Sequence, residues 1–472
     1  MTKLAISAAA AAASVLALPA EAAAHGVQGR AEAPIPISAF FWVAGAVLVV
    51  SFAVLGLGWS RPRLRRVPWR PAPRWLDRAV MSGVTLRVVR AMLLAAFALV
   101  LTASAFGSTR LNENIAPLTI FVVWWAGLVP VSVALGNVWQ AVNPWVTIAR
   151  IIRLPDETRH EPPPGMGWWP AAFVLVLWAW VELVYPTAAR PRLIAALIVG
   201  YSVLTLGGMA RYGVARWLER GEAFSVYTRV LATLAPVEVR DRRLGFRPPL
   251  VGVTRLSPGP AVVAFIIVLI GTVTFDGLSG SRFWQERDVI AAQRLIERGI
   301  DSFTAGIVVA TIGLLVTLAI VLAAYEGCSW LAARLGGWGH GGGSGRAAIA
   351  LAHSLVPIAL AYVVAHYFTL FVFQSQDLIR LASDPFGRGA DIFGTADHRI
   401  DFQLVSANAI WAVQVAAIVI GHVAALALAH DRALELSDGH RAAIRSQVPM
   451  LALMVALTVA GLWSLSEGMA ET

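Results

Sequence analysis

The chain of 472 residues is 58% hydrophobic and only 14% charged, and its mean hydropathy is +0.68. A soluble protein of this length could not bury so much apolar surface, so the composition indicates a polytopic membrane protein. The formal charge of +10 gathers in arginine-rich loops, which argues against a nucleic-acid partner, and the single cysteine, Cys328, excludes disulfides and thiolate metal clusters.

The first 24 residues have the pattern of an export signal. Lys3 is the basic residue, residues 4–18 form the apolar core, and Ala22 and Ala24 are the small residues of a cleavage site. We therefore predict a signal peptide over 1–24 and one integral membrane helical domain over 25–472. Cleavage would expose an amine and an imidazole on His25, a chelating pair that suits copper, with His366 as a further predicted metal ligand.

Apolar stretches of the length that crosses a bilayer, roughly 20 residues, recur along the rest of the chain. The sequence predicts an all-α transmembrane helix bundle of about ten spans. They cover residues 37–59, 88–107, 117–137, 167–186, 192–210, 259–278, 303–325, 350–373, 405–430 and 446–466.

Arginines mark alternate connections between these spans, which is typical of cytoplasmic loops. The segments predicted to be cytoplasmic are 60–87, 211–257 and 431–445. The loops predicted to be periplasmic are 108–116, 279–302 and 374–404. With an exported start, the chain is expected in a bacterial inner membrane, with lipid around it and both mature termini in the periplasm.

His366 lies within the apolar stretch 350–373. An ionisable group at membrane depth costs roughly 2.5–3.5 kcal/mol on insertion scales, so it needs a reason. Helical spacing puts Tyr362, His366 and, if the helix continues, Asp377 along one stripe. His366 is either a neutral side chain bonded to a neighbouring helix or a base or metal ligand facing an outward-open cavity.

Two further carboxylates fall in the same outer layer. Glu182 lies near the outer end of the fourth span, and Asp276 near that of the sixth. Both could reach water as ordinary interfacial groups, but with a histidine they supply the groups of an acid–base or metal site. We predict Glu182, Asp276, His366 and Asp377 as catalytic residues, with a divalent metal as the candidate cofactor. The inner histidines, His353, His422 and His430, receive no role.

Several blocks resemble a family of bacterial membrane proteins labelled fenitrothion hydrolase. They are "WVELVYP", "GEAFSVY", "TVTFDG", "AYVVAHYF", "SDPFGRGADIFGTADHRID" and "IGHVAALALAH". The likeness extends over nearly the whole chain and implies hydrolysis of organophosphate triesters. It brings no catalytic residues with it.

Two other function classes stay open beside a hydrolase acting on a small molecule. In a transporter, permease or ion-coupled channel-like protein, Glu182, Asp276, His366 and His422 would form a proton or ion path. Copper handling or assembly of a respiratory complex is the third class, suggested by His25 and the membrane histidines.

Overall fold

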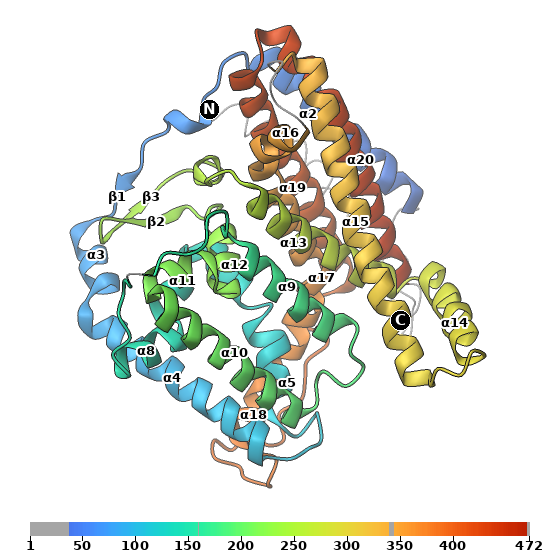
Figure 1. Ribbon diagram of the computed structural model, residues 1–472. Coiled ribbons are helices and arrows are strands. Elements are labelled where there is room, and N and C mark those ends of the chain that lie inside the picture. Colours follow the sequence, from blue (N-terminus) through green and yellow to red (C-terminus); the bar gives the residue numbers. More distant parts are fainter. Residues whose placement is uncertain (1–36, 159, 339–343, 470–472) are drawn as a thin grey trace.

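The computed structural model describes residues 37–158, 160–338 and 344–469, and in these ranges the chain is predominantly helical (Figure 1). The predicted signal peptide and His25 lie outside the described residues. The first half of the described chain contains α2 (Ile37–Gly58), α3 (Arg74–Met81), α4 (Gly83–Phe106), α5 (Ile115–Leu118), a π-helical segment (Thr119–Trp124), α6 (Leu128–Leu135), α7 (Val138–Val142), α8 (Pro144–Ile151), α9 (Trp169–Leu183), α10 (Pro191–Tyr212), α11 (Val214–Arg220) and α12 (Ala223–Ala232). The second half contains α13 (Pro260–Ser279), α14 (Arg282–Ile296), α15 (Ser302–Gly336), α16 (Ser344–Leu351), α17 (Val356–Gln374), α18 (Leu378–Ser383), α19 (Ala407–Leu436) and α20 (His440–Met469).

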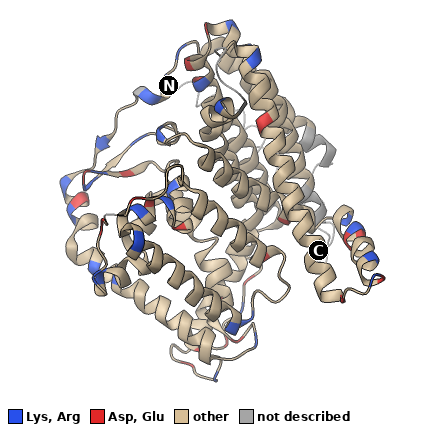
Figure 2. Cartoon of the chain, viewed as in Figure 1, with Lys and Arg blue, Asp and Glu red and all other residues tan. Residues whose placement is uncertain are grey.

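Eight helices in the described part of the chain are long and apolar enough to cross a membrane, and two shorter apolar helices, Trp42–Gly58 and Trp169–Leu183, cover the other two predicted spans. The charged residues lie mainly at helix ends, in connections and along the short helix α14, and the middles of the long apolar helices are almost free of them (Figure 2). The prediction of an all-α polytopic bundle is confirmed, and the chain is a multi-pass membrane protein.

Helix α13 lies at the centre of the bundle. Its sequence from Ala261 to Gly271 is apolar on every face, and such a helix is stable only when other helices surround it. It packs against α9 on one side and against α15 and α17 on the other. It therefore joins the group formed by α4 to α12 with the group formed by α2, α15, α17, α19 and α20 (Figure 1).

A small antiparallel sheet links two arginine-rich segments. Its strands are β1 (Arg70–Pro71), β2 (Val237–Arg240) and β3 (Arg243–Phe246), in the order β1-β3-β2. The sheet holds segments 60–87 and 211–257 together. The prediction that both lie on one side of the membrane is consistent with this pairing.

Part of segment 211–257 does not lie in a surface loop, contrary to our expectation. Helix α12 is almost wholly buried and packs against α6 and α9. Tyr227 stacks on Trp125 with the ring centroids 5.0 Å apart, and the ring of Phe224 lies tilted against that of Trp124 with the centroids 4.1 Å apart. The sequence "AFSVY" is too short to span a bilayer, but its aromatic side chains let it enter the bundle, where the other helices shield its backbone from lipid.

Candidate functional site

Three predicted site residues meet around one tyrosine. His366 Nε2 lies 2.7 Å from Asp276 Oδ2. The hydroxyl of Tyr367 lies 3.3 Å from Asp276 Oδ2 and 3.3 Å from Glu182 Oε1. Three helices that are far apart in sequence thus bring Glu182, Asp276, His366 and Tyr367 into direct contact; we call these four residues the polar cluster.

The helices place this cluster near one end of the bundle. Glu182 is the second-last residue of α9, and Asp276 is within one turn of the end of α13. His366 lies about two turns before the end of α17. α13 contacts both α9 and α17, so the three side chains converge because the central helix brings its neighbours together. The prediction that they share a layer agrees with these contacts.

The cluster is partly accessible from outside the bundle. The His366 side chain is 30% exposed and that of Asp276 is 20% exposed, whereas Tyr367 is buried, with only 7% of its surface exposed. When Nε2–H donates to the Asp276 carboxylate, the lone pair of His366 is on Nδ1 and is free to accept a proton. An imidazole oriented by a carboxylate is the usual arrangement of a general base.

The hydrogen count at Tyr367 is also informative. A tyrosine hydroxyl carries one hydrogen, yet two carboxyl oxygens lie 3.3 Å from its oxygen. One hydrogen cannot satisfy Glu182 and Asp276 fully at the same time. The arrangement is therefore suited to hold a further proton on one of the two carboxyl groups.

Asp377 does not join the cluster. Helix α17 ends at Gln374, and a 3₁₀ turn, η5 (Ser375–Asp377), follows, so the helix does not continue as the stripe with His366 required. The Asp377 carboxylate instead makes a bidentate pair with Arg380, at 2.6 and 2.7 Å. Arg380 also donates to the backbone carbonyl of Asn112, so Asp377 helps to fasten the outer loops to each other.

Tyr362, which the helical spacing put on the same stripe as His366, has another partner. Its hydroxyl donates to the Leu457 carbonyl at 2.5 Å and its ring lies 6.0 Å from that of His422. It ties α17 to α20. The tyrosine that belongs to the site is Tyr367. The sequence feature that could have indicated it is its position directly after His366 in "AHYF".

Two of the inner histidines are buried inside the bundle. The ring nitrogens of His430 lie 3.0 Å from Gln447 Oε1 and 2.7 Å from the Trp59 carbonyl, so His430 connects α19 with α20 and with the segment that directly follows α2. His422 Nδ1 donates to the Ile418 carbonyl on its own helix and is completely buried. Neither contacts the polar cluster in the described part of the chain.

The donors in the described ranges do not fit a metal site. No group of three or more His, Cys, Asp or Glu side chains among these residues is placed to hold an ion. Glu182, Asp276 and His366 are arranged around a tyrosine hydroxyl and not around a common centre, so we assign no step to a metal. The copper prediction for His25 falls outside the described residues and stays a prediction.

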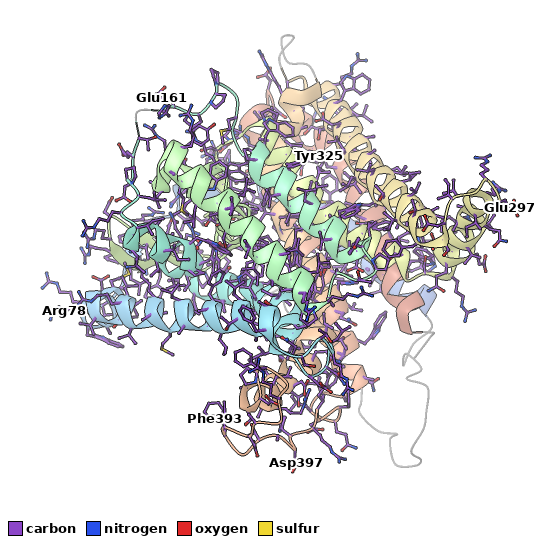
Figure 3. The ribbon with its side chains drawn as sticks, turned by 60° about the horizontal axis from the view of Figure 1, so that its bottom comes forward. Arg78, Glu161, Glu297, Tyr325, Phe393 and Asp397 are labelled. Atoms are coloured by element: carbon purple, nitrogen blue, oxygen red, sulfur yellow. The ribbon has the colours of Figure 1, made fainter. Side chains whose placement is uncertain are left out.

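The long loop 374–404 covers one end of the bundle, with Phe393 and Asp397 at its tip (Figure 3). Asp384 shapes it: burial alone would raise the pKa of this carboxyl, but the backbone N–H groups of Arg388, Gly389, Ala390 and Gly387 together outweigh burial and lower the pKa. The Arg388 guanidinium donates to the carbonyl of Phe106 at the end of α4. The loop is thus attached to the C-terminal end of α4.

A large apolar cavity lies beside the polar cluster. It has a volume of about 770 Å³ and lies between α4, the π-helical segment, α9 and α10. Trp178 lines it, and the Trp178 ring lies 5.6 Å from Trp125, which in turn lies 6.4 Å from Tyr367. Val181, the neighbour of Glu182, also lines it. The cavity and the polar cluster share an aromatic wall.

Comparison with known proteins gives no relative: no family model, no curated protein and no solved structure matches this chain.

Proposed function

We propose that this protein is a hydrolase of uncharged organophosphate-type esters in a bacterial inner membrane, with the polar cluster open to the periplasm. The single observation that carries the proposal is the 2.7 Å contact between His366 and Asp276 in two partly exposed side chains. The resemblance to proteins labelled fenitrothion hydrolase gives the substrate class.

In the proposed reaction His366 is the general base. It takes a proton from a water molecule whose oxygen attacks phosphorus, while the bond from phosphorus to the leaving-group oxygen breaks. The proton then passes to the departing group. Asp276 orients the imidazole and stabilises its charged form. Tyr367 and Glu182 hold Asp276 in place and do not touch the reacting atoms.

The apolar cavity suits such a substrate. Its volume lies within the roughly 300–1,000 Å³ of small-molecule sites, and nearly all its lining side chains are aliphatic or aromatic. An uncharged triester dissolves in lipid and can enter between α9 and α10 without crossing water. Trp178 lies one helical turn before Glu182, so an ester held there has its reactive end next to the polar cluster.

Filling the cavity should weaken substrate binding. Gly200 lines it, and a side chain added there would point into open space. We expect Gly200→Phe to lower kcat/KM for a 4-nitrophenyl phosphotriester roughly tenfold or more, because the ring occupies substrate volume. Gly207→Phe is the matched control: it lies two turns further along α10, also has open space, and does not line the cavity. Equal kcat/KM in both variants would remove the cavity from the substrate site.

The orientation can be tested with cysteines. Asp397 and Arg78 lie near opposite ends of α4, whose 24 residues extend about 36 Å (Figure 3). In a Cys328→Ala background, Asp397→Cys should react with an impermeant thiol reagent in intact spheroplasts, and Arg78→Cys should react only after lysis. The reverse pattern would put the polar cluster on the cytoplasmic side.

Proton-coupled transport is the second candidate function. The two carboxyl groups that share the single hydrogen of Tyr367 favour it, because such a pair can take up and release a proton. Turnover of a triester by purified protein in detergent, without any gradient, supports the hydrolase. Solute accumulation in proteoliposomes that depends on a proton gradient, with no turnover in detergent, supports the transporter.

A further inference from the structure

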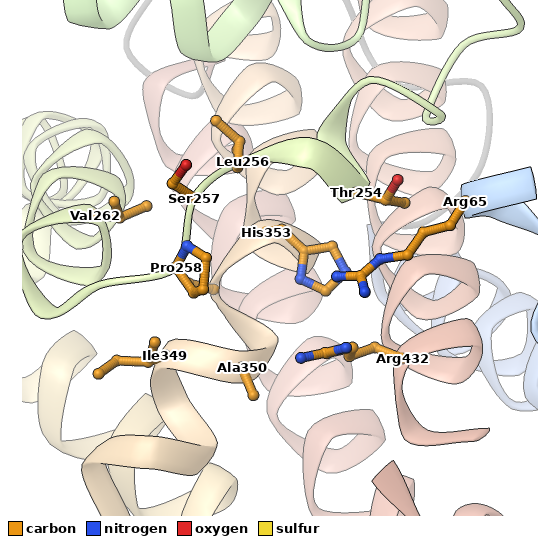
Figure 4. A pocket seen from close by; sticks show the side chains of 11 residues that line it. Arg65, Thr254, Leu256, Ser257, Pro258, Val262, Ile349, Ala350, His353 and Arg432 are labelled. Atoms are coloured by element: carbon orange, nitrogen blue, oxygen red, sulfur yellow. The ribbon is translucent and has the colours of Figure 1, made fainter. Parts of the chain in front are cut away.

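A second polar pocket lies apart from the polar cluster, among the arginine-rich segments. Arg65, His353 and Arg432 line it, together with Thr254 and Ser257 from the loop before α13. Figure 4 shows the nitrogen atoms of Arg65, His353 and Arg432 gathered on one side of the pocket. Its volume of about 20 Å³ has room for one or two water-sized groups, so a larger ligand would insert one end and leave the rest at the mouth.

The charges around this pocket are not balanced. Glu435 Oε2 lies 2.5 Å from Arg432 Nη1 and 3.3 Å from Arg65 Nη1, so one carboxylate serves two guanidinium groups. Arg432 Nε is buried and has no hydrogen-bond partner in the described part of the chain. An anion in the pocket would supply both the missing charge and the missing acceptor.

The fold holds these arginines in position. Asp431, next to Arg432 on α19, accepts hydrogen bonds from the backbone N–H groups of Arg63 and Leu64, at 2.6 and 3.3 Å. That contact anchors the 3₁₀ turn η1 (Leu64–Arg66), which carries Arg65, against the end of α19. The Arg65 side chain is still 51% exposed, so it can move toward a ligand at the mouth.

We propose that this pocket binds a phosphate group, with Arg65 and Arg432 as the cationic donors. Phosphate oxygens match the planar guanidinium donors in pairs, and a phosphate can present one oxygen to the narrow interior while the others stay at the mouth. Thr254 donates its hydrogen to the Val251 carbonyl, so the exposed hydroxyl of Ser257 is the donor on the opposite wall. The phosphate belongs either to a soluble ion or ester or to the head group of a lipid on the arginine-rich side. This site is independent of the proposed hydrolase activity.

The test is thermal unfolding of the full-length protein in detergent. One arm adds millimolar inorganic phosphate at constant ionic strength, and the other adds phosphatidic acid to the micelles, with phosphatidylcholine as the neutral lipid. A ligand that binds the folded state raises the midpoint. We expect Arg65→Gln and Arg432→Gln each to weaken this binding about tenfold, the loss typical of one charge-assisted contact. Arg441→Ala, which removes an exposed charge at the start of α20, should leave it unchanged.

A rise in the midpoint with phosphate alone identifies a soluble ligand, and a rise with phosphatidic acid alone identifies a lipid head group; both outcomes support the site. If Arg432→Gln fails to fold because Glu435 loses its partner, Arg65→Gln decides the matter, since that side chain is half exposed. No rise with either ligand, or the same affinity in wild type and Arg65→Gln, would overturn the proposal.

Discussion

His366→Asn is expected to hydrolyse a 4-nitrophenyl phosphotriester roughly 10²–10⁴-fold more slowly than the wild type, which is the range for loss of a general base. Asparagine is of similar size, so the packing of α17 against α13 should remain. It has no group that takes up a proton near neutral pH, and it therefore removes the one function that the mechanism assigns to the imidazole. The measurement is kcat from nitrophenol release by the purified protein in detergent, with the thermal midpoint as the check on folding.

Two matched variants make this result specific. Asp276→Asn keeps the shape of the orienting side chain but removes its charge, and we expect a loss of about 10²-fold or more, because the imidazolium is then no longer stabilised. His398→Asn alters a histidine in the loop 374–404 that shares no hydrogen bond with His366 or Asp276 in the described part of the chain, and it should retain full activity. A folded His366→Asn protein with wild-type kcat would show that hydrolysis does not depend on this imidazole.

The convergence of Glu182, Asp276 and His366 could be predicted because the bilayer itself limits the possibilities. The position of an ionisable side chain within an apolar helix gives its depth in the membrane. Because such a group is costly there, it is expected to pair with another polar group at the same depth. The three residues lie within about two helical turns of the ends of their helices, at the same end of the bundle. Which neighbours they would face was not predictable, since this depends on how α9 and α17 pack on α13.

The residues that were assigned wrongly or missed depend on local geometry and packing that spacing in the sequence does not show. Asp377 would share a helix face with His366 only if the helix were unbroken. The 3₁₀ turn after Gln374 changes the direction in which the Asp377 side chain points, and Asp377 forms an ion pair with Arg380 instead. Tyr362 has the right spacing, but Tyr367 makes the contacts, since it faces α9 and α13. Helix α12 was missed for a related reason. Its segment is short and arginine-flanked, so its burial becomes visible only when the rings of Trp124, Trp125 and Trp178 are in place around it.

Replacing Glu222 by alanine should destabilise the protein by about 3–5 kcal/mol, because several donors lose their shared acceptor at about 1–3 kcal/mol for each buried one. Glu222 is 1% exposed and begins the buried helix α12. Its carboxylate accepts the backbone N–H of Phe224 at 3.2 Å and of Ser225 at 2.7 Å, and it also accepts the Asn143 amide and the Tyr201 hydroxyl. Alanine would leave four buried donors without an acceptor, in a part of the bundle that water does not easily reach.

The measurement is the free energy of unfolding of Glu222→Ala in mixed detergent micelles, compared with Glu219→Ala. Glu219 lies on the neighbouring helix α11 with an exposed side chain, and its backbone carbonyl accepts a hydrogen bond from Arg229. Its carboxylate makes no hydrogen bond within the described part of the chain. Loss of its carboxylate should therefore change the free energy by less than about 0.5 kcal/mol. Because α12 supports Trp124 and Trp125, Glu222→Ala should also loosen the aromatic wall between the apolar cavity and the polar cluster. Equal stability of the two variants would mean that α12 is held by its aromatic packing alone and not by the carboxylate at its start.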